Sequence, residues 1–149
     1  MDLITQLPKT TTGYDAIAVF VDRLTKMAHF SPIHTSIGAK ALADMFFKDV
    51  VKLHGVPEVV ISDRGAQFAS TFWKEVFDRF GTNVRMSTAF HPQTDRQTER
   101  MNRILEDMMR HYVSPYHDDW DYYLPSCEFA VNDSYQESIR TTPFMLNYA

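Results

Sequence analysis

The sequence predicts an α/β fold in which a mixed β-sheet carries helices on both faces. Apolar residues alternate early in the chain, as in half-buried strands, and recur every three or four residues further on, as on helices. The expected order is three strands, a helix, a strand, a helix, a strand and two helices, so one strand follows a helical crossover. The length of 149 residues suits a single domain, 1–149, with one hydrophobic core.

Three antiparallel strands are expected first. Leu3 to Leu7 forms a short apolar segment that ends at Pro8 and is followed by a turn-like run. Tyr14 to Leu24 has alternating apolar positions, and Met27 to Ile33 is a second run of the same kind. Because the connections between these segments are short and polar, consecutive hairpins are the simplest arrangement.

Helical periodicity replaces alternation from Ala39 onward. The apolar positions that define this helical face are Leu42, Phe46, Val50 and Leu53. Gly55 and Pro57 are expected to end the helix. The run Val59 to Ile61 is continuous and apolar, which is typical of a strand that is covered on both faces.

The remaining elements complete the α/β pattern. A helix is expected to start at a cap, Ser70 or Thr71, and to close at Gly81. The other expected elements are a short strand at Val84 to Ser87, a long helix from about Thr94 to Val113 after a break at His91-Pro92, a helix from Trp120 to about Tyr135, and an apolar tail from Pro143 to Tyr148.

Composition excludes several classes of protein. No apolar run is long enough for a membrane helix, so no membrane association is expected. The single cysteine, Cys127, excludes an internal disulfide and a CxxC zinc module within these residues, and the six histidines lack zinc-site spacing. The formal charge of −4 opposes DNA binding through the overall field, although a carboxylate cluster that holds cations is itself locally acidic.

Two acidic residues occupy positions where chemistry is common. Asp63 directly follows an expected buried strand, where strand ends form a crevice, but a lone aspartate there is more often part of an Asx-turn. Glu99 opens the polar face of the long helix. From the pattern alone, the favoured interpretation is an ordinary ion pair with Arg103, like that of Glu106 with Arg110, each worth only ~0.2 to 0.5 kcal/mol.

Four motifs together resemble the integrase core of gypsy-type LTR retrotransposons, which are kin to retroviral integrases and share a ribonuclease H-like fold. They are MDLI at 1–4, SDRGAQF at 62–68, HPQTDRQTERMNR at 91–103 and TPFMLNYA at 142–149. The family's catalytic acids are an aspartate on the first strand, an aspartate after the fourth, and a glutamate with 35 residues between it and the second. Asp2, Asp63 and Glu99 match this pattern, spacing included. The resemblance implies a five-stranded mixed sheet.

The resemblance also implies a metal-dependent reaction on DNA. Asp2, Asp63 and Glu99 would be both catalytic and metal-binding, with two Mg²⁺ or Mn²⁺ ions, no small-molecule cofactor, and Asp2 bridging the ions. The expected activity is 3′-end processing and strand transfer of retroelement DNA by a nuclear homo-oligomer. The residues expected to contact DNA are Gln93, Thr94, Arg96, Asn102 and Arg103, although Thr94 could simply cap the helix.

The chain departs from the family pattern at its start and beside Glu99. It begins one residue before Asp2, so a fragment truncated at the N-terminus is expected, and Arg96 stands where the family usually has glycine. An inactive or domesticated copy that serves as a binding module, or a genomic relic, therefore remains open. A ribonuclease-H-type nuclease shares the fold but normally has a further carboxylate on the first helix, facing the site.

Overall fold

The computed structural model describes residues 1–62, 66–79, 89–92 and 96–149. These residues form two compact units. Unit 1 comprises Met1 and Ser36–Asp95, and unit 2 comprises Asp2–Thr35 and Arg96–Ala149. The expectation of a single domain, 1–149, stays a prediction.

Unit 2 is built on an antiparallel sheet with the strand order β1-β2-β3. The strands are β1 (Asp2–Ile4), β2 (Ala16–Val21) and β3 (Ala28–Ile33). Asp2 pairs with Val19 in the register of β1 and β2. The three expected antiparallel strands are therefore confirmed, and β1 begins early enough to place Asp2 on the strand itself.

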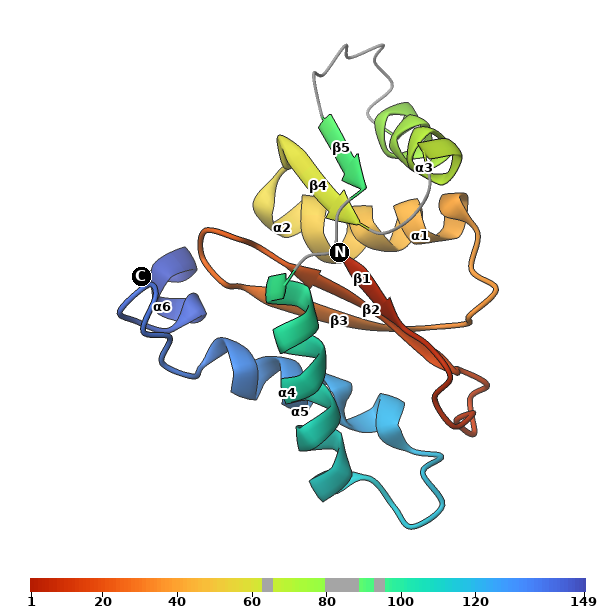
Figure 1. Ribbon diagram of the computed structural model, residues 1–149, viewed down its shortest axis with the longest axis vertical. Helices are drawn as coiled ribbons and strands as arrows, with labels where there is room; N and C mark the ends of the chain where they lie inside the picture. Colours follow the sequence, from red (N-terminus) through yellow and green to blue (C-terminus); the bar gives the residue numbers. More distant parts are fainter. Residues whose placement is uncertain (63–65, 80–88, 93–95) are drawn as a thin grey trace. The chain divides into compact units, whose positions relative to one another are not determined.

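Helices α4 (Arg96–Tyr112) and α5 (Trp120–Asn132) pack against this sheet and against each other. Figure 1 shows the two helices crossing beside the three strands. The hydrophobic core between them includes the buried side chains of Ile17, Val19, Leu105, Leu124 and Cys127. The expected long helix is confirmed from Arg96, whereas the expected start at Thr94 lies outside the described residues.

Side chains of α5 close the free edge of β3. The Asn132 side chain donates from Nδ2 to the Ala28 carbonyl and accepts at Oδ1 from the Ala28 N–H, both at 2.8 Å. Glu128 Oε2 accepts from the Phe30 N–H at 2.9 Å. Pro32, two residues further along, has no N–H to satisfy. Because an unpaired strand edge invites pairing with other chains, this arrangement protects the sheet as well as anchoring α5.

The chain ends in a short helix, α6 (Pro143–Tyr148), where the sequence predicts only an apolar tail. Thr142 caps this helix, since its hydroxyl accepts from the Met145 N–H at 3.2 Å. Pro143 follows at the first helical position, where a missing N–H costs nothing. The capping pair Thr-Pro was the local signal that could have predicted the helix.

Unit 1 contains a parallel pair of strands, β4 (Val59–Ser62) and β5 (Ala89–Pro92). The expected strand at Val84 to Ser87 lies outside the described residues. The break expected at His91-Pro92 is wrong, because these two residues pair with Ile61 and Ser62 as the end of β5. The five strands among the described residues form two sheets, so the single five-stranded sheet of the prediction is not confirmed.

The first helix of unit 1 contains a π-helical segment that periodicity did not predict. It runs as α1 (Ala39–Phe46), the π-helical turn η1 (Phe47–Val51) and α2 (Lys52–His54), and Gly55 ends it with a φ of 81°. A π-turn shifts the buried face by about one residue. Consequently Val51 is buried, whereas Leu53, predicted to face the core, is 52% exposed.

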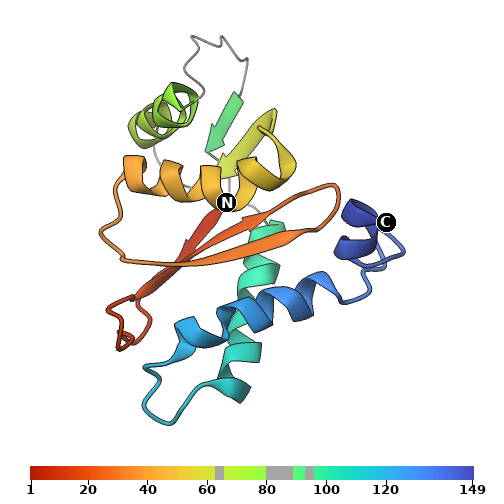
Figure 2. The same cartoon turned by 180° about the vertical axis from the view of Figure 1, so that it is seen from behind.

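Helix α3 (Ala66–Asp78) packs along α1, as Figure 2 shows from behind. The predicted start at Ser70 or Thr71 is wrong, since helical residues begin at Ala66 and the Thr71 hydroxyl donates back to the Gln67 carbonyl at 3.1 Å. Aromatic packing explains the longer helix. The Phe46 ring centroid lies 5.3 Å from that of Phe72, whose neighbour Phe68 stacks on it at 6.5 Å.

Within the described ranges, we find no helix that combines the length and the apolar character needed to cross a bilayer.

The edge closure of β3 predicts a large effect for one buried side chain. Asn132→Ala leaves the N–H and carbonyl of Ala28 without partners in a site where Asn132 is 0% exposed. We expect the free energy of unfolding to fall by about 2 to 4 kcal/mol in chemical denaturation. The exposed neighbour Asp133 provides the control, and Asp133→Ala should change stability by less than about 0.5 kcal/mol. Equal losses in the two variants would contradict the edge-closure role.

Candidate active site

The first candidate acid, Asp2, is held in a defined orientation on β1. It is half-buried, its Oδ1 accepts from the N–H of Leu3 at 2.8 Å, and its Oδ2 accepts from Nδ2 of Asn102 at 2.9 Å. Both partners belong to unit 2. Hydrogen bonds to a charged acceptor are among the stronger ones in proteins, so this carboxylate is positioned before any ligand arrives.

Asn102 connects α4 to that carboxylate. Its amide orientation follows from the contact, because only Nδ2 can donate to a carboxylate oxygen. Its carbonyl oxygen is buried and has no hydrogen-bond partner among the residues that the structure describes. An unpaired buried acceptor costs about 1 to 3 kcal/mol, so this position favours a ligand or water that can donate a hydrogen bond. The sequence placed Asn102 near DNA and did not reveal its contact with Asp2.

The second candidate acid, Glu99, lies on the flank of α4 that Asn102 occupies. The buried stripe of α4 consists of Thr98, Met101, Leu105 and Met109. Glu99 precedes Asn102 by three residues, so the two side chains are neighbours along one side of that stripe. Glu99 is exposed in the first turn of the helix, where the helix dipole favours a negative charge.

The ion pairs considered from the sequence do not form. In the described part of the chain, Glu99 makes no ion pair with Arg103, and Glu106 makes none with Arg110. Arg110 instead approaches Asp107 at 3.7 Å, an i,i+3 contact between exposed side chains. Pairs of this kind differ by only a few tenths of a kcal/mol, so periodicity alone cannot select among them. The Glu99 carboxylate therefore has no ion-pair partner on its own helix in the described residues.

The third candidate acid, Asp63, lies outside the described residues, as do Gln93 and Thr94. Strand β4 ends at Ser62, which is 1% exposed, so Asp63 directly follows a strand end as expected. Among the residues with described positions, no cluster of three His, Cys, Asp or Glu side chains could hold a metal. The two described acids offer carboxylate oxygens, the donor type that Mg²⁺ and Mn²⁺ prefer, so the donor chemistry fits those ions.

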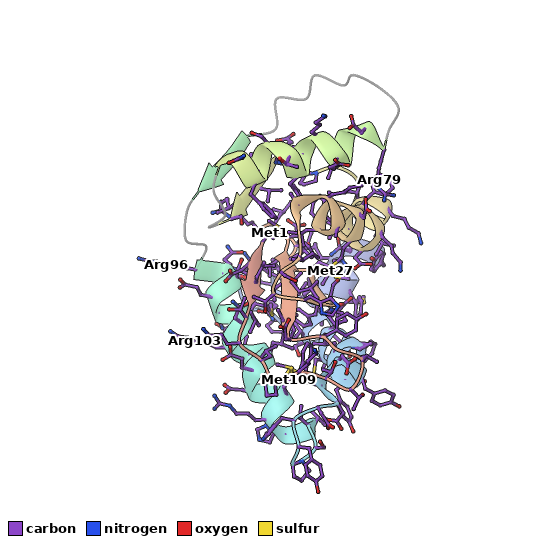
Figure 3. The ribbon with its side chains drawn as sticks, turned by 90° about the vertical axis from the view of Figure 1, so that its right-hand side faces the viewer. Met1, Met27, Arg79, Arg96, Arg103 and Met109 are labelled. Atoms are coloured by element: carbon purple, nitrogen blue, oxygen red, sulfur yellow. The ribbon has the colours of Figure 1, made fainter. Side chains whose placement is uncertain are left out.

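A row of exposed arginines runs along the outer side of α4. Arg96 and Arg103 project from it, as Figure 3 shows, and Arg100 lies between them in the sequence. Steps of four and three residues put all three on one helix face. Arg96 and Arg103 are among the DNA contacts predicted from the sequence and Arg100 is not, although the i,i+4,i+7 spacing is the signal that could have identified it.

Two other groups with reactive potential have structural roles. Cys127 is 1% exposed in the core of unit 2, and burial raises the pKa of its thiol, which disfavours the nucleophilic thiolate. His29 pairs with Glu128, whose Oε1 lies 3.0 Å from Nδ1 of the imidazole. This contact joins β3 to α5, so the imidazole has a structural role.

A family model and two known relatives match the sequence of this chain. The model of the integrase core domain matches residues 1–92. Two relatives are the Tf2-3 and Tf2-4 transposon polyproteins of Schizosaccharomyces pombe, each 35% identical over 97% of this chain. The chain spans only 11% of the length of those polyproteins.

Solved structures share the fold at lower sequence identity. A simian T-cell lymphotropic virus intasome in complex with PP2A regulatory subunit B56 gamma includes a chain with a TM-score of 0.71 and 16% identity, covering 99% of this chain and 54% of that one. The HTLV-2 integrase catalytic core domain in complex with magnesium, in its trimeric form, gives a TM-score of 0.62 at 16% identity. The match covers 97% of this chain and 99% of that one. The ribonuclease H-like fold expected from the sequence is thus confirmed.

The contact between Asn102 and Asp2 predicts a pH-dependent effect on stability. Asn102→Ala removes a hydrogen bond to a carboxylate, and we expect a loss of about 1 to 2 kcal/mol in the free energy of unfolding. Asn102→Asp should cost more at pH 7, because two carboxylates then meet at contact distance, and the excess should shrink in acid because protonation of either carboxyl removes the repulsion. Denaturation curves at pH 3 and pH 7 measure this. An excess that is the same at pH 3 and pH 7 would refute the contact.

Proposed function

The chain belongs to the integrase core domain family, and on that premise we propose that it is the catalytic core of a retrotransposon integrase. Its proposed activity is the 3′-end processing of element DNA and the transfer of those ends into target DNA. The proposal assigns Asp2, Asp63 and Glu99 as the catalytic and metal-binding residues. Their order and spacing match the family pattern.

One observation carries the assignment most directly. Asn102 holds the carboxylate of Asp2, and Glu99 lies three residues before Asn102 on the same flank of α4 without an ion-pair partner in the described residues. A carboxylate that serves only to stabilise a helix surface would gain from pairing with Arg103. An unpaired glutamate beside a positioned aspartate instead suits the binding of a divalent cation.

The donor set fits hard divalent cations. Two Mg²⁺ or Mn²⁺ ions held by Asp2, Asp63 and Glu99 would stabilise charge on the attacking and leaving oxygens of a phosphodiester. The magnesium complex of the similar HTLV-2 catalytic core supports this choice of ion. Within the chain, Asn102 orients Asp2, and no side chain needs to become a covalent nucleophile, in keeping with the buried thiol of Cys127.

DNA would be bound by the N-terminal part of α4 and the residues before it. Arg96 and Arg103 are exposed and offer guanidinium groups for phosphates, with Gln93, Thr94 and Asn102 as further proposed contacts. These contacts would act locally against a formal chain charge of −4. The proposed setting is a homo-oligomer acting in the nucleus, and the dimeric and trimeric forms of the HTLV-2 core support the oligomer.

Two alternatives differ in testable ways. The acidic net charge is the observation that favours an inactive copy retained as a binding module. A ribonuclease-H-type nuclease would need an additional carboxylate on the first helix. The first helix carries two acids, Asp44 in α1 and Asp49 in η1, and Oδ1 of Asp44 accepts from Nε of Arg79 at 2.9 Å within unit 1. Because the motif at residues 91–103 also matches the integrase pattern, we favour the integrase over the nuclease.

Disintegration of a branched DNA oligonucleotide, with Mg²⁺ or Mn²⁺, is the test of the catalytic assignment. We expect strand-joining products with the unaltered chain and none with Asp2→Asn, Asp63→Asn or Glu99→Gln, because each change removes a charged metal ligand. The matched control is Asp107→Asn, which removes one charge from an exposed position on the same helix. Turnover that persists in all three active-site variants would contradict the assignment of Asp2, Asp63 and Glu99 as catalytic residues. An inactive unaltered chain would instead favour the binding-module alternative.

The salt dependence of DNA binding tests the arginine row separately. Arg96→Gln and Arg103→Gln should each weaken binding to any duplex sequence and reduce the slope of log K against log salt by about 1, because each arginine releases counterions from one phosphate. Arg140→Gln, at an exposed position in unit 2 outside α4, makes the same change in charge and should leave the slope unaltered. Equal effects from all three variants would point to overall charge instead of a local phosphate contact.

A further inference from the structure

Unit 2 contains a groove that the proposed integrase chemistry does not use. It lies between the C-terminal half of α4, the segment that follows β1 and the turn that precedes α5, and its volume is about 230 Å³. All of its lining residues belong to unit 2. None of them is among the residues proposed to hold metal or DNA.

The floor of the groove is apolar, and its residues are fixed by packing in the core of unit 2. Leu7, Met109, Val113 and Trp120 supply its apolar surface. Trp120 is 2% exposed, and its indole N–H donates to the carbonyl of Pro8 at 2.7 Å. Because Met109 is also only 6% exposed, the floor is part of the packed core and needs no rearrangement to receive an apolar group.

One wall of the groove carries the carboxylate of Glu106, and Arg110 and His117 also line the groove. Glu106 is half-buried, and within the described residues it forms no hydrogen bond or ion pair. Its expected partner, Arg110, also lines the groove but approaches Asp107 and is 74% exposed. A carboxylate at the edge of an apolar surface is attracted to a cation more strongly than one in open water, since fewer waters screen it.

We propose that this groove binds a lysine or arginine side chain presented by another polypeptide segment. The aliphatic stem lies on the apolar floor and the cationic end pairs with Glu106, an arrangement that long basic side chains adopt readily. The volume lies below the ~300 Å³ typical of the smallest drug-sized pockets and suits one long side chain. The proposal does not rest on the integrase activity.

The indole of Trp120 supplies a reporter at the floor. The probes are three capped tripeptides, acetyl-Leu-Lys-Leu-amide, the same peptide with norleucine in place of lysine, and the same peptide with glutamate. Each is titrated into the full 149-residue chain while the indole N–H signals of the two tryptophans are followed by NMR. We expect the lysine peptide to shift the Trp120 signal, the glutamate peptide to leave it unchanged, and Trp73, in unit 1, to be unaffected by any of them.

Two substitutions with opposite expected effects on peptide affinity distinguish a cation site from a general apolar groove. Glu106→Gln should weaken binding of the lysine peptide about five-fold, the factor expected for a partly exposed ion pair. Arg110→Gln should strengthen it, because a like charge is removed from the rim. Glu137→Gln, which makes the same change in net charge at an exposed position, should have no effect. Equal binding of the norleucine and lysine peptides, or unchanged affinity in Glu106→Gln, would overturn the proposal.

Discussion

The packing of α4 on the three-stranded sheet is the constraint on which the other features of unit 2 depend. Thr98 and the apolar residues Met101, Leu105 and Met109 are buried in this helix, and the transfer of apolar side chains out of water is the dominant stabilising effect in folding. Once that stripe faces the sheet, the rotation of the helix is determined. Asn102 then meets Asp2, Glu106 lines the groove, and the arginines face outward.

Helix α4 contributes both to the stability of unit 2 and to the candidate active site, and it does so through different sides. The buried stripe holds the sheet, the flank that carries Glu99 and Asn102 adjoins the positioned aspartate, and the outer face carries the exposed arginines. Helical geometry permits this division because residues three and four apart share a side. A change on the outer face can therefore alter interactions with ligands while leaving the core intact.

Polar side chains complete the sheet where backbone pairing stops. Asn132 occupies a fully buried position because its amide offers a donor and an acceptor with the spacing of a peptide group, and Ala28 presents the matching pair. Glu128 bonds both to Phe30 N–H and to His29, so it links the strand edge to a buried imidazole. Such interactions connect residues about one hundred positions apart, and the polar residues involved look unremarkable in the sequence.

The sequence by itself determined the α/β class, the three antiparallel strands, the long helix and the family motifs, because periodicity and motif spacing are local or linear properties. The longer α3 and the position of β5 depended on packing and on parallel pairing with β4, which local propensity does not encode. Only the tertiary structure decided that Asn102 positions Asp2 and that Glu99 and Glu106 stay unpaired within the described residues. Alternative ion pairs on a helix surface are nearly equal in energy, whereas burial of an apolar stripe is worth far more and selects the side on which each polar residue lies.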